Sequence, residues 1–566
     1  MSAATDTVPP ATARPAPRVR RAGRAWRLGG LVIALTMALP VLAIGWLALF
    51  PSENIWPHLA STVLPRYLVN TALLMLGNGI CVLFVGTGTA WLVTMCRFPG
   101  RRLFEWALLL PLAMPAYIVA FVYTDLLEFA GPVQRALRGL FGWQGAGDYW
   151  FPEIRSMGGA VFVMSSVLFP YVYLLGRAAF QEQSSCAIEV SRTLGRGPWR
   201  TFFTVALPLA RPALAVGATL ALMETLADFG TVDYFAVSTL TLGVFNVWLN
   251  MGNAGGAAQI SLVMLGAVLL LVALERASRH RQRHFSMTTR YRPHTGFTLT
   301  GWRAAGASLA CSLPVLIGFV VPAGILLDYA VRFFDVSWSG AYLGHARNSI
   351  LLSATAAIVA VAAALFVAYG RRLAGGPVLA VASRLAGTGY AIPGTVLAIG
   401  VIVPFAAFDN ALDAVMRETF GVSTGLLLSG TVTAIVFAYV VRFLAVALGA
   451  VEASLGRIRP TMDFAARSLG ASPGGILRRV HLPLVRGSLL AAATIVFVDC
   501  MKELPATLIL RPFNFDTLAT QVYQYASTEQ LEYSGLAALT IVAAGIVPVI
   551  LLSRAVSASR PASGRR

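Results

Sequence analysis

Two polar stretches decide the fold of this chain. The first, residues 189–208, reads EVSRTLGRGPWRTFFTVALP, and the second, residues 464–483, reads FAARSLGASPGGILRRVHLP. They share a glycine in register, because the step from Gly195 to Gly470 equals the step from Pro208 to Pro483, and both stretches end on Leu-Pro. A repeat at a fixed period, with polar positions kept inside an otherwise apolar chain, predicts a duplicated module.

Each polar stretch predicts a helix, a tight turn and a second helix. Gly195 and Gly470 are suited to end the first helix, because glycine adopts a left-handed C-cap without a Cβ penalty. Pro198 and Pro473 lie where the second helix would begin, since proline is tolerated in the first turn. An ordinary cytoplasmic loop would explain one such segment, but two at identical offsets favour a functional role.

Composition predicts an integral membrane protein. The 566 residues are 57% hydrophobic and 12% charged, whereas an average soluble domain is about 25% charged. The net charge of +19 is therefore attributed to arginines at the cytoplasmic ends of membrane helices, and no nucleic-acid partner is expected. The five cysteines show no paired spacing, so neither a disulfide framework nor a zinc site is predicted.

Twelve apolar runs are long enough to cross a lipid bilayer, which takes about 20 residues. The runs lie near 28–50, 67–96, 103–127, 158–180, 207–228, 256–274, 304–330, 347–370, 376–406, 424–448, 484–510 and 534–554. The predicted fold class is an all-α membrane protein with about twelve transmembrane helices in two tandem six-helix halves. Because each half has an even number of spans, the halves are expected to run parallel.

The expected organisation has five parts. They are a disordered basic tail (1–27), a first half (28–275), a linker (276–303), a second half (304–555) and a short tail (556–566). Loops on one side of the predicted membrane carry an excess of arginine, and these loops include both polar stretches. The positive-inside rule places them, the linker and both termini in the cytoplasm.

Four carboxylates recur at the period of the polar stretches. Asp499 matches Glu224, and Glu503 matches Asp228, at the same offset that relates Gly470 to Gly195. Within each half the two acids are at i and i+4, which predicts that they share one helix face. An ionisable group in a span should face the bundle interior or a water-filled cavity. Four acids around a pseudo-twofold axis would suit a hard cation such as Fe³⁺ in a substrate path.

A structural role is the alternative for these acids: they would cap helices or pair across the interface between the halves. Asn70 and Asn348, which occupy matching positions of the two halves, pose the same choice between substrate path and interhelical hydrogen bonds. No stable metal site is expected, because a path must release its cargo. If the path role holds, neutralising Asp228 and Glu503 together should lower uptake while assembly persists.

The two polar stretches resemble a known family. A glutamate, a glycine six residues later and a closing apolar-x-Leu-Pro are similar to the EAA loop of membrane permeases of binding-protein-dependent ATP-binding-cassette importers. In that family the loop forms a coupling helix that docks on an ATPase subunit. One departure is that Phe464, preceded by Asp463, stands where the first loop has Glu189. The resemblance implies these ATPase-coupling residues: Glu189, Gly195, Leu207, Pro208, Asp463, Phe464, Ala465, Ala466, Gly470, Leu482 and Pro483.

Three further stretches resemble the fused permeases of ferric-iron importers: METLADFGT (223–231), MKELPAT (501–507) and RPFNFDTLA (511–519). This resemblance implies that the cargo is ferric iron or a ferric chelate. It also implies delivery by an extracytoplasmic binding protein, two separate ATPase subunits, and a place in the bacterial inner membrane. Thiamine, polyamine, phosphonate and sulfate permeases share the scaffold and stay as alternatives.

The chain has no sequence for binding ATP. A phosphate-binding P-loop needs Gly-x-x-x-x-Gly-Lys-Ser/Thr, and Lys502, the only lysine, lies between Met501 and Glu503. No cofactor is therefore expected in this chain, which is predicted not to be an enzyme; ATP and Mg would bind to the partner subunits. A secondary transporter would also show parallel halves, but it has no need of two helix–turn–helix loops. A membrane enzyme or scaffold is disfavoured because no catalytic cluster is evident.

Overall fold

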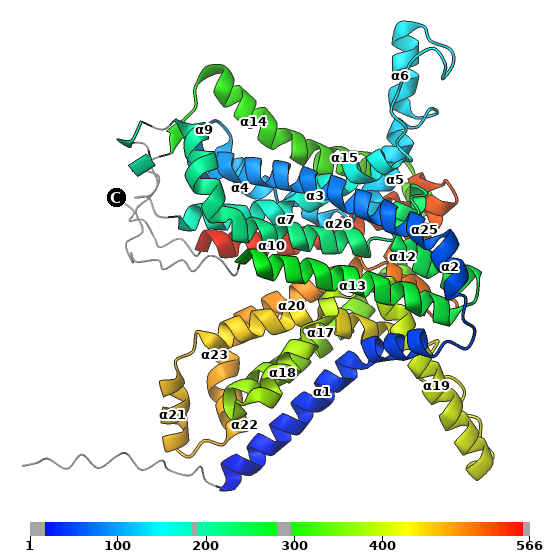
Figure 1. Ribbon diagram of the computed structural model, residues 1–566, viewed down its shortest axis with the longest axis vertical. Helices are drawn as coiled ribbons and strands as arrows, with labels where there is room; N and C mark the ends of the chain where they lie inside the picture. Colours follow the sequence, from blue (N-terminus) through cyan, green and yellow to red (C-terminus); the bar gives the residue numbers. More distant parts are fainter. Residues whose placement is uncertain (1–16, 184–189, 192, 196, 280–295, 559–566) are drawn as a thin grey trace, which may run out of the picture.

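The computed structural model describes residues 17–183, 190–191, 193–195, 197–279 and 296–558, and the fold is almost entirely helical (Figure 1). Within these residues, 12 helices are long and apolar enough to cross a membrane, which confirms the predicted class. The only strands among them are β1 (Cys96–Arg97) and β2 (Phe297–Thr298), which pair in parallel.

Helices of the first half precede residue 280. They are α1 (Pro17–Leu49), α2 (Trp56–Thr62), α3 (Leu64–Met95), α4 (Arg101–Ala107), α5 (Ala116–Leu127), α6 (Pro132–Phe141), α7 (Met157–Glu182), α9 (Pro198–Thr201), α10 (Leu207–Ala227), α11 (Gly230–Tyr234), α12 (Leu240–Phe245) and α13 (Ala254–Arg279).

Helices of the second half follow residue 300. They are α14 (Gly301–Val315), α15 (Val321–Arg332), α16 (Phe334–Ser337), α17 (Gly340–Ala374), α18 (Pro377–Ala386), α19 (Gly394–Phe420), α20 (Val432–Gly456), α21 (Pro460–Ser468), α22 (Pro473–Ile476), α23 (Leu482–Met501), α24 (Pro505–Leu510), α25 (Leu518–Ser527) and α26 (Gly535–Ala558).

Two expected spans are broken rather than continuous. The runs 103–127 and 376–406 each contain a short helix, a 3₁₀ turn and then a long helix that starts after Pro115 or Pro393. The residues before these prolines, Met114 and Ile392, are extended at both places, because proline disfavours the α conformation of its predecessor. The candidate spans are therefore residues 116–141, which comprise α5 and α6 with a break between them, and residues 394–420.

The boundaries of four other spans also differ from prediction, and the eighth begins at Gly340 rather than near 347. The fifth and eleventh begin earlier, at Trp199 and Pro473, because π-helical turns continue each helix–turn–helix segment into its span. The eleventh ends at Met501, before the separate helix α24. The tenth covers 432–456 rather than 424–448.

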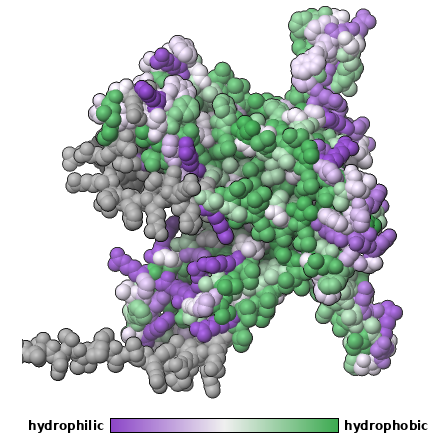
Figure 2. Space-filling model, viewed as in Figure 1, coloured by the Kyte–Doolittle hydropathy of each residue, from purple (hydrophilic) through white to green (hydrophobic). Residues whose placement is uncertain are grey.

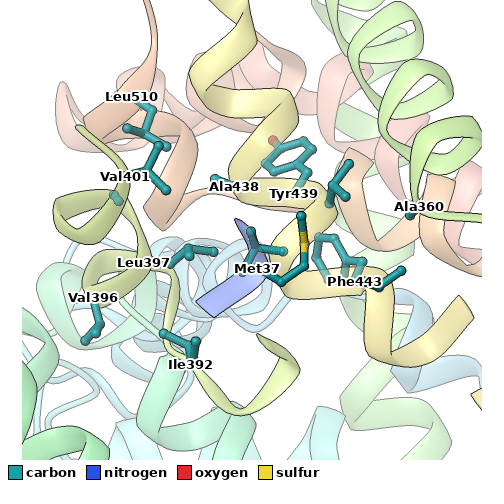
Figure 3. Packing of buried hydrophobic residues seen from close by; sticks show 14 of the residues in the cluster. Met37, Ala360, Ile392, Val396, Leu397, Val401, Ala438, Tyr439, Phe443 and Leu510 are labelled. Carbon is teal, nitrogen blue, oxygen red and sulfur yellow. The ribbon is translucent and has the colours of Figure 1, made fainter. Parts of the chain in front are cut away.

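The first long helix of each half crosses to the other half. Helix α1 packs against α17, α18 and α19, while α14 and α15 pack against α3, α4 and α5. Figure 3 shows Met37 of α1 among side chains of α19 and α20, including Leu397 and Phe443. The two halves are therefore interlocked by an exchange of helices that the sequence pattern did not indicate.

The two ends of the molecule differ. Helices α9, α21 and α22 lie at one end, so both polar stretches share a side, and α6 and the end of α19 project at the other (Figure 1). Apolar residues cover the middle, and a hollow separates two lobes at the end that carries the polar stretches (Figure 2). This arrangement is what parallel halves in a bilayer require.

Gly318 tests the helix exchange. It lies in the π-helical segment Leu316–Val320 between α14 and α15, where a Cβ atom would meet the carbonyl oxygen of Ser166 in α7. We expect Gly318→Ala to destabilise the protein by about 1–3 kcal/mol, because backbone there cannot move aside easily. The readout is the thermal unfolding midpoint in detergent.

The matched control is Gly324→Ala in the same span, where a Cβ atom would meet nothing within 4 Å. Alanine should be neutral or slightly stabilising there, since it favours a helix more than glycine does. Equal unfolding midpoints for the two variants would show that this span does not pack against α7 in this way.

Candidate substrate path and coupling loops

A cavity of about 110 Å³ lies where the halves meet. Residues of α5, α7 and α10 line it from the first half, and residues of α20 and α23 line it from the second. It has room for several water molecules. All four predicted acids, Glu224, Asp228, Asp499 and Glu503, line this one cavity. The structure therefore brings them together, and their role in transport stays a proposal.

The acids of each half do not share a helix face as predicted. Helix α10 ends at Ala227 and α23 ends at Met501, so each helix stops before its second acid. The chain turns there, and Asp228 and Glu503 lie in the connections to the next helices. The two acids of each half are four residues apart in sequence, but the helix ends between them in both halves.

Asp228 and Glu503, which we call the capping acids, each hold the start of a short helix. The Asp228 carboxylate accepts hydrogen bonds from the Thr231 backbone N–H at 2.9 Å and from the Thr231 hydroxyl at 3.1 Å. Glu503, at the matching position of the second half, accepts from the Ala506 backbone N–H at 3.1 Å. Such caps satisfy N–H groups that have no partner within the helix. The capping acids therefore have the helix-capping role that was the alternative to a role in the substrate path.

Glu503 also forms an ion pair with Arg442. The guanidinium lies 3.0 Å from the carboxylate, and both side chains are at least nine-tenths buried. Gly394 leaves room for the pair, because a Cβ atom there would lie 2.6 Å from Glu503. Removing one partner of a buried ion pair leaves an uncompensated charge. Neutralising both capping acids should therefore impair assembly, which changes the expected outcome of that double variant.

Glu224 and Asp499, which we call the open acids, make fewer contacts than the capping acids do. One Glu224 oxygen accepts a hydrogen bond from the Tyr390 hydroxyl of the other half at 2.7 Å. One Asp499 oxygen lies 2.9 Å from the Lys502 ammonium. Within the described residues, no hydrogen bond reaches the second oxygen of either carboxylate. Each open acid can therefore still accept a ligand from the cavity.

The charge of the cavity is asymmetric. Its two basic residues, Arg442 and Lys502, both come from the second half. The matching positions of the first half are Val167 and Ala227, which also line the cavity. Four carboxylates against two basic groups leave the cavity acidic, with the uncompensated acids in the first half. Within the described residues, no three His, Cys, Asp or Glu side chains are placed to hold a metal ion.

Sequence reasoning missed Arg442 and Tyr390 as cavity residues. An arginine inside the apolar run 432–456 was a usable signal, because ionisable groups in spans face the bundle interior. Tyr390 had no such signal, since tyrosine is common in membrane helices. Its position depends on the break before Pro393, which turns residues 389–391 toward the other half.

Asn70 and Asn348 do not line the cavity. Asn70 donates a hydrogen bond to the Ser238 carbonyl at 3.0 Å, and Asn348 donates to the Asp516 carbonyl at 3.1 Å. The hydroxyl that follows each asparagine accepts the first backbone N–H of α12 or α25. The asparagines therefore fix equivalent loops, which supports the hydrogen-bond alternative, and their place in a substrate path stays a prediction.

The two polar stretches, residues 189–208 and 464–483, are from here on called the coupling loops. Both form the predicted helix–turn–helix wherever they are described. The backbone φ angle is +74° at Gly195 and +79° at Gly470, and α9 and α22 begin at Pro198 and Pro473. The Leu-Pro pairs at 207–208 and 482–483 start α10 and α23. Glu189 lies outside the described residues, so its predicted contact stays a prediction.

The loops expose apolar side chains that a soluble surface would normally hide. Leu194 and Trp199 are 69% and 73% exposed in the first loop, and Phe464 and Leu469 are 61% and 88% exposed in the second. Ala465 and Ala466 lie beside Phe464 on α21, which has no buried residue. Clustered exposed apolar side chains are typical of a protein-binding surface.

Asp463 faces inward rather than toward a partner. Its carboxylate accepts a hydrogen bond from Arg372 Nε at 2.8 Å and lies 2.6 Å from His481 Nε2. Partial burial opposes ionisation, but these two hydrogen bonds outweigh it and hold the pKa of Asp463 below its ordinary value. Asp463 therefore anchors α21 to α17 and to the start of α23. These contacts support a structural role, and its assignment as a coupling contact stays a prediction.

Comparison with known proteins shows to which family the chain belongs. Residues 82–284 match the family described as the binding-protein-dependent transport system inner membrane component. The molybdenum transport system permease protein of Escherichia coli strain K12 is 30% identical over 217 residues, which cover 91% of that protein and 36% of this chain. The chain belongs to this family. A match to nearly a whole relative that covers 36% of this permease also fits a duplicated chain.

One longer relative aligns with most of the permease, and a shorter one aligns with about a third of it. The Fe(3+)-transport system permease protein of Haemophilus influenzae is 27% identical over 491 residues, covering 86% of this chain and 89% of the relative. The sulfate transport system permease protein of Escherichia coli strain K12 is 28% identical over 190 residues, covering 32% of this chain and 65% of the relative. The predicted resemblance to importer permeases is confirmed, and the permease is a multi-pass inner membrane protein.

Gly470 tests the turn of the second coupling loop. We expect Gly470→Val to uncouple ATP hydrolysis from transport while the permease still inserts, because a β-branched residue resists the positive φ of this turn. Strain of about 1–2 kcal/mol would redirect α21. The measurement is the ratio of transported cargo to ATP hydrolysed in proteoliposomes with the partner subunits.

The control is Gly474→Val in α22. A Cβ atom meets nothing within 4 Å at either glycine, but only Gly470 has a positive φ. Normal coupling in the Gly470 variant, or equal loss in both, would contradict the role of the turn.

Asp463 and its neighbour Phe464 should behave oppositely. Asp463→Ala removes the half-buried carboxylate that pairs with Arg372 and His481, so we expect about 1–3 kcal/mol of destabilisation and loss of ATPase binding. Phe464→Glu should keep stability, because that side chain is exposed and the first loop has glutamate in register. Thermal unfolding and co-purification of the ATPase measure both effects.

The Asp463 anchor should also depend on pH. Because the folded pKa is lowered, its stabilisation is present above the ordinary aspartate range and is lost as pH falls through the folded pKa. The difference in unfolding midpoint between wild type and Asp463→Ala should therefore shrink under acid conditions. A difference that is independent of pH would exclude the anchoring role.

Proposed function

We propose that this permease imports ferric iron or a ferric chelate, driven by separate ATPase subunits. The observation that carries the proposal is the acidic cavity between the halves, with four carboxylates against two basic groups. Carboxylate and phenol oxygens are hard ligands that suit a trivalent cation. The relative from Haemophilus influenzae, which aligns with 86% of the chain and is named an Fe(3+)-transport permease, supports the same cargo.

An oxyanion is the second candidate, because relatives are named as molybdenum and sulfate permeases. The cavity argues against it. An anion would meet unpaired acids of the first half, while both basic groups are already paired with second-half acids. Like charge in a site of low dielectric is strongly unfavourable. Thiamine and polyamines are cationic and would tolerate the acids, so they remain alternatives in the transport assay.

The coupling loops supply the link to energy. Each of the two loops would bind one ATPase subunit, because each presents exposed apolar side chains at the same end of the molecule. An extracytoplasmic binding protein would deliver the cargo at the opposite end, where α6 and α19 project. The loops and both termini would then face the cytoplasm, in line with their arginine content. ATP and Mg would bind to the partner subunits alone.

The open acids are the groups to test, because they line the cavity without capping a helix. We expect Glu224→Gln combined with Asp499→Asn to lower ATP-driven ⁵⁵Fe uptake by about tenfold, which corresponds to about 1.4 kcal/mol of barrier. Complex assembly and basal ATP hydrolysis should persist. Initial uptake rates in proteoliposomes that contain the permease, the ATPase and the binding protein give the measurement.

Asp335→Asn is the matched control, since this exposed acid lies on α16 and does not line the cavity. Wild-type uptake of molybdate or sulfate without any uptake of iron would overturn the proposed cargo. Full iron uptake by the double variant would remove the open acids from the path.

A further inference from the structure

Lys502 is one of the two basic residues that line the cavity. It is the only lysine of the chain, and it lines the cavity with its ammonium 2.9 Å from Asp499. The corresponding residue of the first half is Ala227, so Glu224 has a tyrosine hydroxyl as its partner instead of a cation. One open acid is therefore already neutralised and the other is not.

The two basic groups of the cavity are held very differently. Arg442 is at least nine-tenths buried, contacts Glu503 at 3.0 Å and is packed closely against Gly394. Lys502 is 29% exposed and makes a single contact with Asp499, which is 20% exposed. A guanidinium in such a pair is fixed, whereas a lysine ammonium is a point charge on a flexible stem. Only the Lys502 pair can open without unpacking the protein.

A second observation indicates that the cavity takes a ligand. The hydroxyl of Tyr117 is buried and lines the cavity, yet no hydrogen-bond partner for it exists within the described residues. A buried polar group without a partner is unfavourable. An occupant of the cavity could accept a hydrogen bond from this hydroxyl or bind its oxygen, and the free oxygens of Glu224 and Asp499 line the same cavity.

We propose that Lys502 is an exchangeable counter-cation, whose ammonium takes the place beside Asp499 that a passing cation occupies. The inference rests on the proposed cation transport. Cargo would first meet Glu224, which has no competing cation, and would then displace Lys502 from Asp499. The ammonium returns when the cargo leaves. Competition of this kind weakens cargo binding in the cavity and so favours release.

The single lysine allows a direct test on the purified full-length permease chain. Reductive methylation with ¹³C-formaldehyde keeps the charge of lysine and yields one lysine signal, which is distinct from that of the N-terminal amine. The probe is gallium(III) citrate, a redox-inert trivalent cation, with citrate alone as the control. We expect gallium to shift the Lys502 signal toward its position in the Asp499→Asn variant. Citrate should leave the signal unchanged, and gallium should not shift the variant further.

Binding affinity gives an independent readout. Lys502→Met should tighten gallium binding by about tenfold, within the usual range of coupling between two sites. Lys502→Arg retains a competing charge and should bind gallium as weakly as wild type. A purely structural role for Lys502 predicts the opposite, because loss of its ion pair would disturb the cavity and weaken binding.

The outcomes separate this inference from the proposed function. An unchanged Lys502 signal at saturating gallium, or binding no tighter in Lys502→Met, overturns the counter-cation role even if ⁵⁵Fe uptake is normal. A gallium-dependent shift in a complex that transports no iron would support the exchange and overturn the proposed cargo. A shift produced by citrate alone would assign the effect to the anion and contradict the proposal.

Discussion

The arrangement of this permease depends on how backbone N–H groups are satisfied where a short helix begins among membrane spans. Such groups cannot turn to water, so the protein must provide the acceptor. Asp228 and Glu503 do this at equivalent positions, each accepting from the backbone N–H three residues later. The caps allow α10 and α23 to stop and the chain to turn, which opens one cavity at the meeting of the halves.

The four acids of the cavity therefore have two different roles in the structure. Two of them cap helices, and the other two each keep one oxygen atom without a hydrogen bond within the described residues. Glu503 is committed to α24 and Arg442, whereas Glu224 and Asp499 keep an oxygen toward the cavity. The exchange of α1 and α14 between the halves then holds both walls of the cavity in one body. Because the halves run parallel, the two coupling loops reach the same end and could transmit movement to this shared site.

Local sequence signals predicted much of this structure, and contacts distant in sequence account for what was missed. The repeat, the spans and the turns at Gly195 and Gly470 followed from periodicity, length and glycine geometry. The breaks before Pro115 and Pro393 were weakly signalled, because membrane helices tolerate proline. The inward direction of Asp463 and the crossing of α1 depend on partners far away in the sequence, such as Arg372, which no local pattern reveals.

The central claim is that one chain supplies both halves of the path and both coupling loops. The most direct test is the mass of the purified complex with its ATPase, measured by native mass spectrometry. The account predicts one permease chain with two ATPase subunits. A complex of two permease chains and two ATPase subunits, in which each chain uses a single loop, would contradict it.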